Sequence, residues 1–302
     1  MREDGRMGEQ VSRKLGSGSN AEIREDRWRP GTFALVVDGT PQSHVDLGDP
    51  TELSFEYVRR MGHVIDQLLT PRASITAVHL GAGALTIPRY VAHTRPGSRQ
   101  QVIELDRDLV DLVREVLPWS KLDGIRVRYG DAREMLGKLP DALLGSCDLL
   151  VIDVFSGARI PAHVTSVEFY REAVRLLAPN GVVLVNVADG PPLRFARAQA
   201  ATLAAALSPA ASSAPNPASV IALAETQVLK GRRFGNVVLA GSPGGIPAAW
   251  LPRLLSNGPH PAAVLGGNEL ATWTTGALVT TDADATASPE PGRGVFQFGG
   301  GS

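Results

Sequence analysis

Four signals for ligand chemistry stand at the ends of segments that the sequence predicts to be strands. The turn Gly81-Ala82-Gly83 follows the apolar segment 75–80, and Glu104 lies at the end of the next one. Asp131 follows the strand predicted at 125–129, and Asp153 lies where the strand predicted at 148–154 ends. The carboxyl ends of neighbouring parallel strands meet at one edge of a sheet, where open α/β sheets bind their ligands. We therefore expect these residues to line one shared crevice.

The glycine turn and Glu104 favour a nucleoside in that crevice. Glycines let the backbone approach a ligand closely, and the start of the following helix stabilises polar or anionic groups. Thr86 replaces the third glycine of the dinucleotide fingerprint, which argues against NAD. Glu104 lies about 20 residues beyond the turn, where a carboxylate can accept hydrogen bonds from two ribose hydroxyls. The alternatives are an ordinary tight turn and, at Asp106 or Asp108, a helix cap.

The other two acids suit different tasks. Asp131, in Gly130-Asp131-Ala132, can accept a hydrogen bond from an exocyclic adenine amine, or it can simply cap the helix that follows. Asp153 ends the most apolar strand and could serve as a general base if a nucleophile lies within hydrogen-bond reach. A loop-capping role is the alternative for Asp153. The shared crevice favours the functional interpretation of both.

The elements that would position these residues alternate between strand and helix from residue 75 onward. Strands are predicted at 75–80, 101–105, 125–129, 148–154 and 182–187. Helical spacing of apolar residues is found at 86–94, 108–117, 132–139, 166–177 and 192–207. This alternation predicts a parallel sheet with helices on both faces. Two late strands are expected at 220–223 and 237–240, and one short helix near 250–255.

The chain ahead of this region has a different pattern. Residues 33–37 are strand-like, Asp38-Gly39 is a strong turn signal, and residues 43–47 could form the returning strand. A helix is expected over 53–69. We therefore divide the chain into a disordered lead (1–31), a small β element with a linking helix (32–70), a nucleotide-binding domain (71–281) and a disordered tail (282–302).

The composition limits the classes of partner. The net charge of −1 gives no electrostatic reason to expect nucleic acid or a membrane surface. No apolar run reaches the roughly 18 residues of a membrane helix, and the polar start lacks the core of a secretory signal.

The single cysteine, Cys147, fits a reducing compartment, and we expect a cytoplasmic protein. The histidines show no metal-ligand spacing, so no metal is expected. Arg59-Arg60 is either an exposed basic pair or an anion clamp, and the exposed pair is the favoured interpretation.

The order of these motifs resembles the spermidine synthase (aminopropyltransferase) family, and is most similar to its actinobacterial spermidine synthase-like members. The resemblance runs over about residues 33–240. It rests on residues 35–42 (Leu-Val-Val-Asp-Gly-Thr-Pro-Gln), Phe55-Glu56-Tyr57, the Gly81 turn, Glu104-Leu105-Asp106, Gly130-Asp131-Ala132 and Asp153. It implies a Rossmann-like class I methyltransferase fold with a small N-terminal β element. It also implies a role in polyamine biosynthesis, with an S-adenosyl donor as co-substrate, decarboxylated or not, and a small amine or other small acceptor. A homodimer is a possible assembly.

The resemblance also implies roles for individual residues. Asp153 and Tyr57 would be catalytic, with Tyr57 orienting the acceptor amine and Asp153 taking its proton. The nucleoside side of the donor would be held by Gln42, Gly81, Ala82, Gly83, Glu104, Asp131 and Ala132.

The chain departs from the family pattern in the region that would bind the amines. Ala84 stands where the family has an aspartate for the donor's amine, and Ser156 replaces a second acid of the catalytic loop. Val58 and Arg59 also differ, and cations including Arg233 occupy the late polyamine-binding segment. Two alternatives to aminopropyl transfer therefore stay open. One is an S-adenosylmethionine-dependent methyltransferase acting on a non-polyamine substrate, and the other is a nucleoside-binding protein without catalysis.

Overall fold

The computed structural model describes residues 10–208 and 219–291, which form a four-stranded and an eight-stranded sheet with helices around them. The strands are β1 (Gln10–Lys14), β2 (Asn20–Glu25), β3 (Thr32–Val37), β4 (Thr40–Asp46), β5 (Thr76–Leu80), β6 (Arg99–Glu104), β7 (Ile125–Tyr129), β8 (Cys147–Ile152), β9 (Leu177–Asp189), β10 (Val220–Glu225), β11 (Gly235–Gly241) and β12 (Ala262–Gly266). The helices are α1 (Glu56–Asp66), α2 (Thr86–Thr94), α3 (Arg107–Val116), α4 (Ala132–Leu136), α5 (Val167–Val174), α6 (Arg194–Leu207), α7 (Thr226–Leu229), α8 (Trp250–Asn257) and α9 (Gly267–Trp273).

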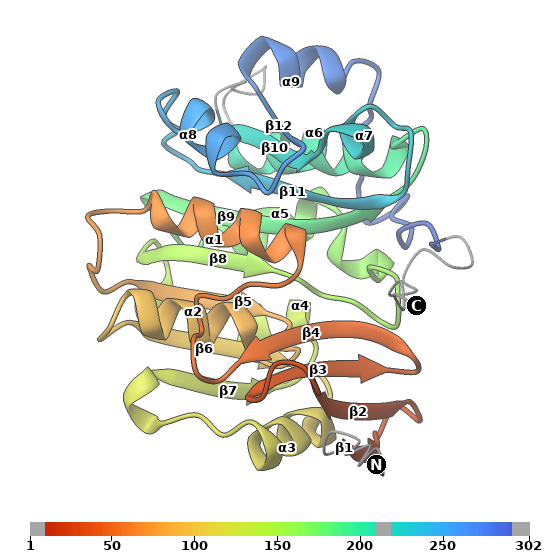
Figure 1. The fold of residues 1–302 in the computed structure, drawn as a ribbon. Helices are drawn as coiled ribbons and strands as arrows, with labels where there is room; N and C mark the ends of the chain where they lie inside the picture. Colours follow the sequence, from red (N-terminus) through yellow and green to blue (C-terminus); the bar gives the residue numbers. More distant parts are fainter. Residues whose placement is uncertain (1–9, 209–218, 292–302) are drawn as a thin grey trace.

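The large sheet has the strand order β12-β10-β11-β9-β8-β5-β6-β7 (Figure 1). The five strands from β9 to β7 are parallel, as the alternating pattern predicts. The sheet is nevertheless mixed, because β11 runs antiparallel to both β9 and β10, and β12 runs antiparallel to β10. The predicted parallel arrangement thus holds for these five strands and does not extend to this edge. Short connections such as residues 226–234, between β10 and β11, leave no room for a full crossover helix.

Alternating side chains on the central strands explain why both faces are covered. Leu149 and Val151 of β8 belong to a core with α1, α2 and α8. Leu150 and Ile152 of the same strand belong to a second core with α4, α5 and α6. All four are at most 3% exposed, because a strand between two helical layers must be apolar on both faces. The prediction that this is a central strand is confirmed.

The small sheet has the order β1-β2-β3-β4 and lies beside α3 and the β7 side of the large sheet (Figure 1). Ala21, Ile23 and Leu35 pack against Leu112 and Val113 of α3, forming a core of their own. The expected disordered lead is thus wrong for residues 10–31, since β1 and β2 fall there. Their apolar residues are few and separated by charged ones, so the sequence signal is weak until α3 supplies a surface to bury them. Residues 1–9 lie outside the described part of the chain.

Two further differences concern the later part of the chain. The glycine- and proline-rich segment 241–270 contains β12 and the start of α9 in addition to the expected helix near Trp250. The described part of the expected disordered tail, residues 282–291, packs against the body of the protein. Asp282 pairs with Arg133, and the buried Ser288 hydroxyl accepts a hydrogen bond from the Ile160 N–H at 2.9 Å. These contacts involve residues more than 100 positions away, which a local pattern does not report.

Among the described residues, no helix has both the length and the apolar character needed to span a bilayer. The expected boundary at residue 32 falls inside the small sheet, because β2 pairs with β3. The boundaries at residues 71 and 282 stay predictions.

Candidate active site

A cavity of about 1190 Å³ lies at the carboxyl ends of the parallel strands, against the small sheet. All nine residues that the sequence suggested for the site line it. They come from β4, α1, the loop after β5, β6, the start of α4 and the loop after β8, so one crevice collects residues spread over more than 100 positions. The sequence predicted this convergence from the strand ends. The role of each residue stays a prediction.

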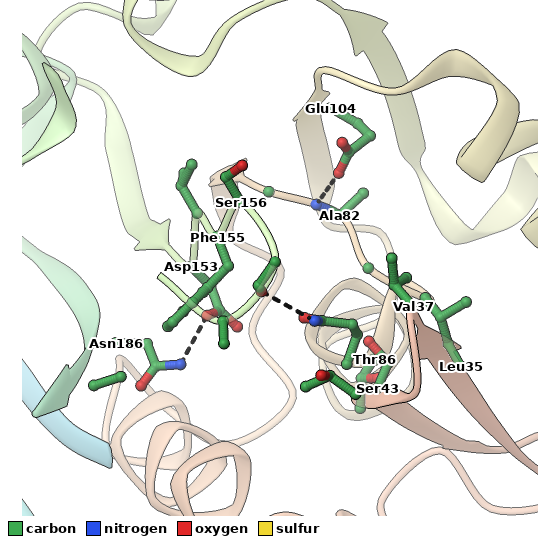
Figure 2. A pocket seen from close by; sticks show the side chains of 18 of the residues that line it. Leu35, Val37, Ser43, Ala82, Thr86, Glu104, Asp153, Phe155, Ser156 and Asn186 are labelled. Atoms are coloured by element: carbon green, nitrogen blue, oxygen red, sulfur yellow. Dashed lines mark hydrogen bonds between the residues drawn. The ribbon is translucent and has the colours of Figure 1, made fainter. Parts of the chain in front are cut away.

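The glycine turn is fixed by the residues around it. Gly81 has a φ of +91°, and a Cβ there would meet the Asp153 carbonyl oxygen at 2.2 Å, so only glycine fits this approach. The Glu104 carboxylate accepts a hydrogen bond from the Ala82 N–H at 2.9 Å (Figure 2). It accepts another from the Asp106 N–H at 3.0 Å. Burial raises the pKa of Glu104, although these backbone bonds lower it in part. Each carboxylate oxygen keeps a second lone pair for a ligand hydroxyl.

Asp131 has more partners than the sequence predicted. Its Oδ1 caps α4, accepting bonds from the N–H groups of Arg133 and Glu134 at 2.9 and 3.1 Å. Its Oδ2 lies 2.7 Å from Nε2 of His163, a cavity residue that sequence reasoning missed. Burial opposes ionisation of Asp131, but the N–H groups and His163 outweigh it, so its pKa is lowered. The helix-cap alternative is therefore realised, and an adenine amine would share Asp131 with His163.

Asp153 stands at the centre of a chain of polar side chains. Its Oδ1 accepts a hydrogen bond from Asn186 Nδ2 at 2.8 Å (Figure 2). Its Oδ2 accepts one from the Tyr57 hydroxyl at 3.4 Å. Asn186 in turn accepts a bond from Asn236 at 2.9 Å. Burial raises the pKa of Asp153 against the opposing effect of its two donors, and it also raises the pKa of Tyr57 well above its usual range. Sequence reasoning missed Asn186, although an asparagine within the apolar segment 182–187 was the available signal.

The small sheet connects the glycine turn to the loop after Asp153. Gln42 of β4 donates a hydrogen bond to the Gly157 carbonyl at 3.1 Å, and the Ser43 hydroxyl accepts one from the Ala84 N–H at 3.1 Å. Ala84 is 1% exposed and packs in the core of the small sheet and α3. The position that carries a carboxylate in the resembled family is thus occupied here by a buried methyl group.

Two arginines and two glutamates lie at the other end of the cavity, beyond Tyr57. Arg60 is one helical turn after Tyr57 and lies 3.3 Å from Glu56. It is 3% exposed, so the expectation of an exposed Arg59-Arg60 pair is wrong for Arg60. Its guanidinium also donates to the Pro259 carbonyl at 2.9 Å, a distant partner that makes this burial possible. Glu225 is 6% exposed and forms an ion pair with Arg233, its Oε2 lying 2.9 Å from the arginine Nε.

In the part of the chain that the structure describes, no group of three or more His, Cys, Asp or Glu side chains is arranged to hold a metal ion. The chemistry that the described cavity residues can supply is hydrogen bonding, charge and proton transfer.

Comparisons with known proteins agree with the geometry. No family model matches the chain. It is 28% identical over 141 residues to a polyamine aminopropyltransferase of Vibrio vulnificus, covering 46% of each chain. It is 25% identical over 149 residues to one of Chromobacterium violaceum, covering 49% of this chain and 54% of the relative. The chain thus spans about half the length of the curated relatives it matches.

Solved structures extend the likeness over nearly the whole chain. A probable spermidine synthase from Corynebacterium glutamicum ATCC 13032 superposes with a TM-score of 0.78 and 28% identity, over 95% of this chain and 98% of that one. The spermidine synthase of Thermotoga maritima, at 14% identity and a TM-score of 0.54 over 80% and 74% of the two chains, shares the fold. The Rossmann-like fold with a small N-terminal sheet is as the motifs predicted, and in sequence and fold the chain is similar to spermidine synthases.

Proposed function

We propose that the chain transfers an aminopropyl group from a decarboxylated S-adenosyl donor to an amine acceptor. The observation that carries the proposal is Asp153. It is held by Asn186 and Tyr57 in a cavity whose one end has the Glu104 and glycine-turn arrangement suited to a nucleoside. The relatives named as aminopropyltransferases and the C. glutamicum structure support the same reaction class.

In the proposed reaction the acceptor amine attacks the carbon next to the sulfonium of the donor. A C–N bond forms as the C–S bond breaks, and the sulfur keeps the electron pair, leaving neutral methylthioadenosine. The ammonium of the bound acceptor gives one proton to the Asp153 carboxylate as it attacks, which frees the nitrogen lone pair, and the product keeps the positive charge on its new secondary ammonium. The raised pKa of Asp153 brings it closer to the operating pH, which strengthens a base for this purpose. Tyr57 stays protonated, so its hydroxyl can orient the carboxylate or the amine.

The donor's nucleoside is proposed to lie against the glycine turn. Gly81, Ala82 and Gly83 offer backbone at close approach, and Glu104 offers lone pairs to ribose hydroxyls. Gln42 and Ala132 line the same end, and Asp131 with His163 would meet the base.

Ala84 favours a second candidate, a methyltransferase that uses S-adenosylmethionine. A buried methyl group replaces the carboxylate that would hold the primary amine of a decarboxylated donor. The two donors discriminate between the candidates. The purified protein is incubated with each donor and a panel of small amines, and products are identified by mass spectrometry. Methylthioadenosine from the decarboxylated donor supports aminopropyl transfer, and S-adenosylhomocysteine supports methyl transfer. Tight binding of a nucleoside without turnover of either donor would contradict both and favour a non-catalytic binder.

A further inference from the structure

The charged residues at the far end of the cavity are connected to Asp153 by short steps. Tyr57 contacts Asp153, and Arg60 follows one turn later on α1. The Glu225 charge acts on Arg60, and Glu225 pairs with Arg233. These side chains all line the cavity that an acceptor must enter when its amine is at Asp153.

The carboxylates at this end already have cationic partners. Glu225 lies 2.9 Å from Arg233, and Glu56 lies 3.3 Å from Arg60. Among the described residues that line this end, Asp153 is the carboxylate without an arginine or lysine beside it. A diamine brings two ammonium groups, and a charge in a partly dry site is stable only when paired. The cavity matches one of the two and leaves the second without a counter-ion.

Arg233 instead offers donors to a negative group. Its Nε lies 2.9 Å from Oε2 of Glu225, and among the described residues no hydrogen-bond acceptor is found for its two terminal nitrogens. Its side chain is 56% exposed and lines the cavity. The buried Glu225 holds the base of a planar guanidinium whose outer edge can receive a carboxylate through two parallel hydrogen bonds. Val228 lines the same region and supplies an apolar surface for a methylene chain.

We infer that the acceptor is an amine that also carries a carboxylate, with the amine at Asp153 and the carboxylate on Arg233. This inference rests on the proposed transfer reaction. It goes beyond that proposal, because it replaces the diamine with a different class of acceptor, an amino acid whose amine is separated from the acid by a short chain.

The test compares acceptors that differ only in charge. Initial rates are measured with the decarboxylated donor and either 1,4-diaminobutane, 4-aminobutanoate or ornithine, which is the same diamine bearing a carboxylate. We expect kcat/KM to be at least about 10-fold higher for a carboxylate-bearing acceptor than for the diamine. Arg233→Met should lower that value about 10- to 100-fold, as loss of a charge-assisted hydrogen bond does. The same substitution should leave kcat/KM for the diamine unchanged or raise it.

Arg232→Met is the matched control, because Arg232 precedes Arg233 and bonds to Gln227 outside the cavity lining. It should leave the ratio between acceptors unchanged. The inference is overturned if the wild type prefers the diamine and Arg233→Met does not change the ratio of kcat/KM between the acceptors. That result would leave the proposed aminopropyl transfer intact.

Calorimetry makes the inference testable even if no acceptor is turned over, an outcome that counts against the proposed function. Binding of 4-aminobutanoate and ornithine is measured in the presence of methylthioadenosine. Weaker binding by Arg233→Met than by Arg232→Met supports the acceptor class. Equal binding by the two variants, or no binding by the wild type, overturns it.

Discussion

The two ends of the cavity are built in different ways. The end proposed for the nucleoside, called the nucleoside end below, consists of backbone and of carboxylates at strand ends, where Glu104 contacts the Ala82 N–H and Asp131 caps α4. The far end consists of side chains from separate elements, with Arg60 on α1 and Glu225 at the end of β10. Backbone geometry is dictated by the fold, so the nucleoside end can serve any member of that fold. The far end can change one side chain at a time, and there the chain departs most from the resembled family.

This comparison predicts that substitutions at the two ends have separable effects. A change at the nucleoside end should alter donor affinity, a change at Asp153 should alter turnover, and a change at the far end should alter the choice of acceptor.

The largest effect is expected at the junction between the ends. Asp153→Asn keeps the size of the side chain and removes the base, so turnover should fall by about 10²–10⁴ while nucleoside affinity stays nearly unchanged. The measurement is kcat with the best acceptor found, together with calorimetry of methylthioadenosine. Asp148→Asn is the control, because Asp148 lies near the opposite end of the same strand and contacts the Thr76 N–H outside the cavity. A wild-type rate for Asp153→Asn would show that another group takes the proton.

The sequence predicts the nucleoside end of the cavity better than the far end, because the former depends on strand ends and the latter on side chains from separate elements. The turn at Gly81, the acid at Glu104 and the aspartate at Asp153 follow from a local pattern, because each comes directly at the end of an apolar strand. The cavity position of Arg60 does not, because its burial depends on the Pro259 carbonyl, 199 residues away. The pairing of Asp131 with His163 could not be predicted from the local sequence either, because it joins the start of α4 to a segment that follows β8.

The fold shows the same division. The strand pattern predicts the parallel half of the large sheet well, since β8 is a nearly continuous apolar run and predicted helices separate the strands there. It misses β1 and β2, which carry few apolar residues and gain their core only against Leu112 and Val113 of α3. The reversal of β11 is also set by the short connection after β10 and not by the composition of either strand.

A middle-sized effect is expected at the nucleoside end. Glu104→Ala removes lone pairs proposed for ribose, and it also removes the acceptor that holds the Ala82 and Asp106 N–H groups. Affinity for methylthioadenosine should weaken by about 1–3 kcal/mol. Calorimetry measures it, and thermal melting reports any general loss of fold. Glu115→Ala on α3, which removes an exposed glutamate paired with Arg13, should leave affinity unchanged. If both variants bind equally well, Glu104 is not part of the site.

The smallest effect concerns the pH dependence of the proposed base. Asp153 must be ionised to accept a proton, so kcat/KM falls as the pH drops through its pKa. Burial raises that pKa, and the hydrogen bond from Asn186 lowers it in part. Asn186→Leu removes this donor at similar size, so the pKa should rise and the acidic limb of the rate profile should move to higher pH. A shift of about one unit is expected, because one unit corresponds to ~1.4 kcal/mol and a bond to a charged group contributes ~1.5–3 kcal/mol.

Asn236→Leu tests the chain of bonds behind this shift. Asn236 contacts Asn186 and not Asp153, so its replacement should move the acidic limb in the same direction by less. A profile of kcat/KM against pH for the three proteins gives the order directly. If the acidic limb of the profile lies at the same pH in all three proteins, ionisation of Asp153 does not control kcat/KM at acidic pH. A shift toward lower pH in Asn186→Leu would contradict the sign of the effect, since losing a bond that favours the carboxylate cannot make that carboxylate easier to form.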